Sequence, residues 1–71
     1  MFIDKGLKPD PENAGYVLGW GVLRYSPWHL AGMYTAKETA EVEAANLGSE
    51  YEVHYGSHRV GSDDFVWHGG S

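Results

Sequence analysis

Hydrophobic and polar positions divide this chain into alternating stretches and one helical stretch. The clearest alternation is YVLGWGVLRY, residues 16–25, which we predict to be a β-strand. One side of this strand carries Tyr16, Leu18, Trp20 and Val22, and the other carries Val17, Gly19, Gly21 and Leu23. Because both sides are apolar, we expect both faces of the sheet to be at least partly covered.

The two glycines of this strand leave space on one face. We expect a helix to pack there, because a glycine opposite a small residue allows close approach. That arrangement would leave the face with Tyr16, Leu18 and Trp20 less covered by the chain itself. The alternative is that Gly19 and Gly21 mark a β-bulge.

The helical stretch is TAKETAEVEAANLG, residues 35–48. Thr35 is a candidate N-cap with Glu38 as its capping-box partner, and Gly48 is a candidate left-handed C-cap. Good helix formers fill the interval. The small and apolar residues that share one face at helical spacing are Ala36, Ala40, Ala44 and Leu47.

Three further strands complete the predicted fold. Ser26-Pro27 predicts a turn into a second strand at Trp28–Tyr34. A third strand is predicted at Ser49–Ser57, where Tyr51, Val53 and Tyr55 form an apolar face, and a short fourth at 65–67. The predicted fold is an α+β, ββαββ domain: a four-stranded, mainly antiparallel sheet with one helix, about residues 35–47, on one face.

The N-terminal segment follows no period. Gly and Pro interrupt residues 1–15, so we expect a flexible arm, with a short strand at Met1–Asp4 as the exception. Residues 16–68 would form a single α+β domain and residues 69–71 a tail.

Composition limits the chemistry and the compartment. The 71 residues contain no cysteine, which excludes disulfides and a thiolate zinc site. No apolar run approaches the roughly 20 residues that span a bilayer, and the N-terminus lacks the features of a signal peptide. We therefore expect a cytoplasmic protein with no cofactor.

Negative charge is the next constraint. Ten acids against five bases give a formal net charge of -5, which disfavours direct binding to nucleic acid and favours a partner with a basic surface. The acids concentrate around one base, Lys37, at Glu38, Glu41, Glu43, Glu50 and Glu52. They are either a solvated face or an acidic patch that steers a partner.

The stretch YGSHRVGSDDF contains the candidate catalytic and metal-binding groups. A triad would draw on Ser57 or Ser62, His54 or His58, and Asp63 or Asp64, but there is no nucleophile elbow and little room for a substrate pocket. On a straight strand His54 and His58 would be roughly 13 Å apart, too far to share one ion. The structural alternative pairs Arg59 with Asp63 or Asp64 across a loop over His58–Val60. We predict no catalytic and no metal site.

Aromatic residues exceed what one helix can cover. They are Trp20, Tyr25, Trp28, Tyr34, Tyr51, Tyr55 and Trp67. Some must form the core, and the rest are expected on the uncovered sheet face, where they would bind a partner or a second copy.

Two resemblances accompany this interpretation. The stretch GMYTAKETAEVEAANLG resembles, in outline, half of the peptidoglycan-binding SPOR repeat, whose second half has no counterpart here, so its function is not carried over. In size, charge and build the chain is similar to phage-encoded inhibitors of host defence, including anti-CRISPR proteins, some of which imitate nucleic acid with carboxylates.

The functional hypothesis is a small, acidic, non-catalytic protein-binding module that acts as a phage-type inhibitor of a host-defence or nucleic-acid-binding complex. The alternatives are a structural or regulatory homodimer, and a metal-binding or hydrolytic module built on residues 54–64. The predicted partner-binding residues are Trp20, Trp28, Glu38, Glu41, Glu43, Glu50, Glu52, His58, Arg59, Asp63 and Asp64.

Overall fold

The computed structural model describes residues 1–68 as a small α+β domain with one helix and a mixed sheet. The predicted tail, residues 69–71, lies outside the described residues. The elements in chain order are β1 (Phe2–Ile3), β2 (Lys8–Pro9), β3 (Tyr16–Arg24), β4 (His29–Tyr34), α1 (Lys37–Leu47), β5 (Glu52–Arg59) and β6 (Phe65–Trp67).

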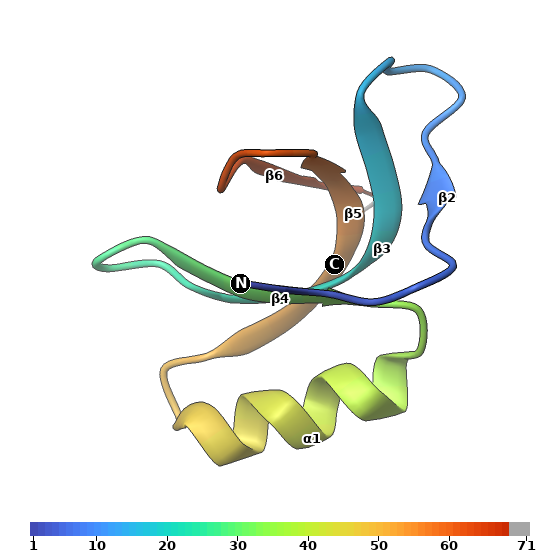
Figure 1. The fold of residues 1–71 in the computed structure, drawn as a ribbon. Helices are drawn as coiled ribbons and strands as arrows, with labels where there is room; N and C mark the ends of the chain where they lie inside the picture. The colour runs from blue at the N-terminus through green and yellow to red at the C-terminus, as the bar shows by residue number, and fades with distance from the viewer. Residues whose placement is uncertain (69–71) are drawn as a thin grey trace.

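Strand β3 is the centre of the sheet, whose order is β1-β4-β3-β5-β6, with β2 also pairing with β3 (Figure 1). Antiparallel ladders join β3 to β4, to β5 and to β2. Trp20 of β3 lies between Tyr34 of β4 and Tyr55 of β5. The β3–β4 register shifts between Val22 and Leu23, so the irregularity is not at the glycines.

The sheet is larger than the four strands expected, because the N-terminal segment joins it. The short strand expected at Met1–Asp4 is confirmed as β1, which runs parallel to β4, and β2 adds a further antiparallel pair. The Asp4 amide donates to the carbonyl of Met33, and the Asp10 amide donates to the carbonyl of Tyr16. These backbone bonds join the segment expected as an arm to β4 and to the start of β3.

Helix α1 confirms the predicted helix but not its predicted N-cap. The N-cap residue is Ala36, without a side-chain cap. The Thr35 hydroxyl and amide instead both donate to Oδ2 of Asp4, at 2.9 and 3.0 Å, which lowers the pKa of Asp4. Gly48 ends the helix as predicted, and its amide bonds to the carbonyl of Ala44, although its φ of 139° and ψ of 168° are not left-handed helical.

The helix covers the face of β3 opposite to the one predicted. Buried Ala40 and Ala44 pack with Val22 and Tyr34, and Trp20 packs against the same cluster. The expectation that the alanines lie over Gly19 and Gly21 is therefore wrong. Strict alternation separates the two faces of a strand, but the alternation itself does not say which face meets the helix.

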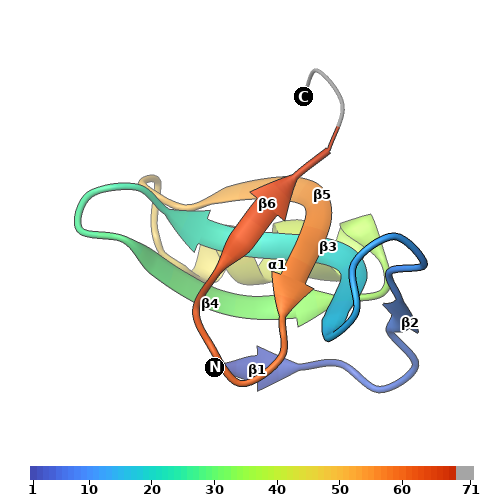
Figure 2. The ribbon, with the colours of Figure 1, turned by 90° about the horizontal axis from the view of Figure 1, so that it is seen from above.

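A second core fills the other face. Leu23, Leu30, Met33 and Phe65 form it, with Leu7 against its edge. Figure 2 shows why: the sheet bends so that β6 crosses β3 on the side away from α1. A Cβ on Gly21 would lie 2.7 Å from the Phe65 ring, so the glycine makes room for Phe65. The expectation that both faces are covered is confirmed.

Strand β5 runs further than predicted. It begins at Glu52 and ends at Arg59, so His58 and Arg59 belong to the strand instead of a loop. Pairing explains the difference, because His58 lies opposite Val17 on β3 and Phe65 on β6. Among residues 1–68, no helix has the length and apolar character needed to cross a bilayer.

Candidate binding surface

Four rings gather beyond the second core, on the sheet face away from α1. Trp67 is their centre: it stacks on His54 at 5.2 Å and on Trp28 at 6.5 Å between ring centroids. The Tyr25 ring meets Trp67 edge-on at 5.8 Å. We call Tyr25, Trp28, His54 and Trp67 the ring cluster.

The ring cluster draws on three separate segments. The β3–β4 turn, which contains a cis Ser26–Pro27 bond, supplies Tyr25 and Trp28, while β5 and β6 supply the other two rings. The indole N–H of Trp28 donates to the backbone carbonyl of Asp63 at 2.9 Å, which ties the turn to the β5–β6 loop. Nevertheless Tyr25, Trp28 and Trp67 keep exposed fractions of 47%, 36% and 37%. These contacts therefore hold the rings in place, and the rings remain accessible to solvent.

Glu52 places a carboxylate beside these rings. Its Oε1 lies 3.0 Å from Nε2 of His54, and the exposed fraction of its side chain is 47%. The pKa of the Tyr25 phenol is raised, first by partial burial of the ring and then by the charge and the hydrogen bond of Glu52. The alternation of β5 puts Glu52 and His54 on the same face.

The predicted partner-binding residues fall on different surfaces. Glu38, Glu41 and Glu50 are exposed on or just beyond α1, and Glu43 is half-buried, where its charge adds to the burial that raises the pKa of Tyr34. Trp20 lies on this helix side under the ammonium of Lys37. Trp28, Asp63 and Glu52 belong instead to the ring-cluster side.

The predicted His/Asp loop is held together by structural contacts. His58 is buried, and its Nδ1 donates to the backbone carbonyl of Asp64 at 2.9 Å. Arg59 lies 3.9 Å from the Asp64 carboxylate, as the structural alternative predicted. Ser62 donates to the carbonyl of Arg59 and accepts from the amide of Asp64. These groups stabilise the turn, and within residues 54–64 no serine is hydrogen-bonded to a histidine.

Ser57 is instead joined to two residues outside the predicted triad. Its hydroxyl donates to Oδ2 of Asp10 at 2.5 Å, and Nε2 of His68 lies 3.0 Å from its Oγ. Hydrogen bonds from Ser57, the Asn13 side chain and the Glu12 amide lower the pKa of Asp10 to about 2, so Asp10 is ionised at neutral pH and Ser57 must donate to it. His68 is then the donor toward Ser57 Oγ, the reverse of a general base.

Asp10 is the residue of this network that the sequence analysis missed. The signal was present, since a short acidic side chain followed by Pro, Glu and Asn is typical of a turn that bonds its own backbone. Its Oδ1 accepts from the amide of Glu12 and its Oδ2 from the side chain of Asn13. The contact with Ser57, 47 residues away, required the tertiary structure.

Acid should weaken this network, because Asp10 has a folded-state pKa of about 2 against an ordinary value of 3.8. Its contribution to stability is complete above pH 4 and is lost as the pH falls toward 2. We expect the melting temperature of the wild type to fall more steeply between pH 4 and pH 2 than that of Asp10→Asn, as followed by circular dichroism. Glu12→Gln is the control and should keep the wild-type slope; equal slopes for Asp10→Asn and the wild type would contradict the assignment.

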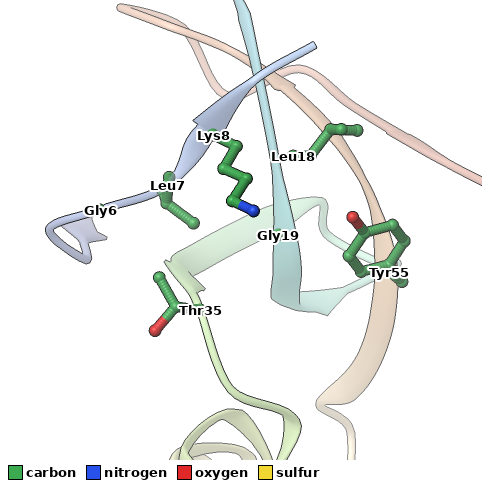
Figure 3. Close-up of a pocket in the computed structure, with 7 residues that line it drawn as sticks. All are labelled: Gly6, Leu7, Lys8, Leu18, Gly19, Thr35 and Tyr55. Carbon is green, nitrogen blue, oxygen red and sulfur yellow. The ribbon is translucent and has the colours of Figure 1, made fainter.

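A small cavity of about 240 Å³ lies between β2, β3 and β5 (Figure 3). Leu7, Leu18 and Gly19 form its apolar part, and Lys8, Thr35 and Tyr55 supply polar groups. The Thr35 hydroxyl is already bonded to Asp4. The cavity is at the lower limit of a ligand site, and its polar lining residues Lys8, Thr35 and Tyr55 are exposed.

No group of three or more His, Asp or Glu residues within 1–68 is arranged to hold a metal ion. Comparisons with protein families, with curated proteins and with solved structures found no match.

Proposed function

We propose that this chain is a non-catalytic protein-binding module whose partner presents a basic surface. The observation that carries the proposal is the ring cluster: three large aromatic side chains that are positioned by contacts with one another and yet remain more than one-third exposed. Exposed Trp and Tyr are typical anchors of protein interfaces, because they bury much area at low cost in conformational entropy.

Charge indicates the kind of partner. The net charge is -5. Within residues 1–68, the carboxylates that form ion pairs are those of Glu52, which pairs with His54, and Asp64, which pairs with Arg59. A negatively charged protein attracts a basic surface from a distance, and that attraction weakens as salt is added.

A second candidate function uses the helix side. Glu38, Glu41 and Glu50 are exposed, and no ion pair within residues 1–68 neutralises any of them. Exposed carboxylates are the groups by which an inhibitor imitates nucleic acid toward a nucleic-acid-binding partner. This candidate keeps the binding role and changes the surface that performs it.

One experiment tests both surfaces. The chain is immobilised and used to capture proteins from a lysate of its host at low and high salt, alongside Trp28→Ala and a Glu41→Lys, Glu43→Lys, Glu50→Lys variant. We expect a salt-sensitive partner that Trp28→Ala loses and the charge-reversed variant retains in part.

The outcomes separate the candidates. Loss of the partner only with the charge-reversed variant would transfer the function to the helix side. Retention of the same partner by both variants, or of none by the wild type at any salt, would contradict a protein-binding role of either surface. Thermal melts of each variant show whether a loss of binding comes from a loss of fold.

A further inference from the structure

Among residues 1–68, the carboxylate of Glu52 at the ring cluster forms no ion pair with a lysine or an arginine. The guanidinium of Arg24, the last residue of β3, is directed elsewhere: its Nε donates to the carbonyl of Pro27, and the group lies over the Tyr51 ring. Arg59 pairs with Asp64, and Lys37 lies over Trp20. Within residues 1–68, the ion pair of Glu52 is with His54 alone.

One ring nitrogen of His54 meets that carboxylate, and the other is buried. Its Nε2 lies 3.0 Å from Glu52 Oε1, whereas its Nδ1 is buried and has no hydrogen-bond partner within residues 1–68. A buried N–H without an acceptor costs more than a bare ring nitrogen in the same place, so the tautomer with the proton on Nε2 is favoured. The carboxylate of Glu52 therefore accepts a hydrogen bond from His54 and lies beside the phenol of Tyr25.

A planar cation fits this combination of groups better than a compact one. An arginine guanidinium stacks on aromatic faces and presents N–H donors in its own plane, so it can lie on a ring and pair with a carboxylate at the same time. A lysine ammonium has strongly hydrated donors and no flat face. Within the ring cluster, Tyr25, Trp28 and Trp67 each keep more than one-third of their surface exposed.

We propose that Tyr25, Trp28 and Trp67 together with Glu52 bind an arginine side chain on a basic segment of the partner protein. This inference rests on the proposed function and deepens it, since it names the group that the partner inserts. Charge complementarity supports this occupant over a second copy of the chain, because two copies would bring like net charges of -5 together.

The probe is a blocked peptide, acetyl-Gly-Gly-Arg-Gly-Gly-amide, titrated into the labelled chain while the indole N–H signals are followed by NMR. We expect the signals of Trp28 and Trp67 to shift with a Kd of about 1 mM, a range suited to one side chain. The signal of Trp20, on the helix side, should not move and serves as the internal reference.

Matched peptides identify the chemistry without altering the protein. The same peptide with citrulline keeps the planar shape and loses the charge, and it should bind about tenfold more weakly. The lysine peptide should also bind more weakly than the arginine peptide. Equal binding of the arginine and citrulline peptides, or of the arginine and lysine peptides, would overturn the arginine assignment.

Two protein variants locate the site. Glu52→Gln should weaken the arginine peptide about tenfold, whereas Glu50→Gln removes a nearby exposed charge outside the cluster and should leave the Kd unchanged. Equal Kd values for the two variants would place the attraction in the overall charge and overturn the site. Indole signals that shift with the concentration of the protein in the absence of peptide would assign the surface to a second copy of the chain. That result would also overturn the arginine site.

The two proposals fail in different ways. If a partner is captured through Trp28 but the arginine peptide shifts no indole signal, the binding module stands and the arginine site falls. If the peptide binds as expected but no protein is captured, the arginine site stands and the protein-binding function falls.

Discussion

Replacing Gly56 with alanine should lower the free energy of unfolding by about 3 kcal/mol, at the upper end of what overpacking costs. An added Cβ would meet the carbonyl oxygen of Val66 and lie 2.5 Å from Cα of Trp67. Both contacts are with the backbone of β6, which cannot rotate away as a side chain can. For a domain of this size, that loss corresponds to a fall in melting temperature of about 15 °C.

The strand next to Gly56 carries both Phe65 of the second core and Trp67 of the ring cluster. We therefore expect Gly56→Ala to weaken the arginine peptide as well as the fold, with melting followed by circular dichroism and binding by the indole signals. Gly6→Ala is the control: its φ is 86° and nothing lies within 4 Å of an added Cβ, so it should cost only about 1 kcal/mol. Equal costs at the two glycines would show that β6 does not lie against Gly56.

Truncating Leu23 to alanine should be comparably severe. Leu23 has an exposed fraction of 0% and packs in the second core with Leu30, Met33 and Phe65. Removal of a buried leucine side chain leaves a cavity and costs about 2–5 kcal/mol. A domain of this length is stable by only about 4–10 kcal/mol, so chemical denaturation should find the midpoint of the variant at about half the wild-type denaturant concentration.

Leu47→Ala is the matched control for the second core, because the chemical change is the same. The helical spacing predicted Leu47 in the buried stripe, whereas the structure leaves it with an exposed fraction of 41%. We expect its loss to cost less than about 1 kcal/mol. If Leu47→Ala cost as much as Leu23→Ala, the helix would be rotated from its described position and the assignment of the two cores would be wrong.

The candidate surface was only partly predictable. The excess of aromatic residues indicated an exposed aromatic face, and Trp28 and Glu52 were among the predicted partner-binding residues. From the sequence, Glu52 groups with the helix acids because they are neighbours along the chain. In the structure Glu52 lies beside His54 and the ring cluster, because alternate residues of β5 face opposite sides of the sheet.

Contacts between distant residues explain the rest of the differences. Thr35 was a reasonable N-cap by its local sequence, but Asp4, 31 residues away, accepts its hydroxyl and amide hydrogens. Ser57 was considered beside His58 and Asp63, whereas its buried hydroxyl meets Asp10. A side chain with several possible partners is assigned by proximity in space, which short-range patterns do not contain.

By itself, the sequence determined the elements whose signals are local: the central strand, the hairpin turn at Pro27, the helix ending at Gly48, the last strand at 65–67 and the acidic charge. Periodicity, capping glycines and turn residues act within a few positions, so they can be recognised without the fold. Only the tertiary structure decided which face of β3 the helix covers, that β1 and β2 join the sheet, and that Tyr25, Trp28, His54 and Trp67 meet. Those outcomes depend on how the sheet bends and on which distant residues fill its two faces. The interior is close-packed, so the free energy of each contact depends on segments that are far apart in the chain.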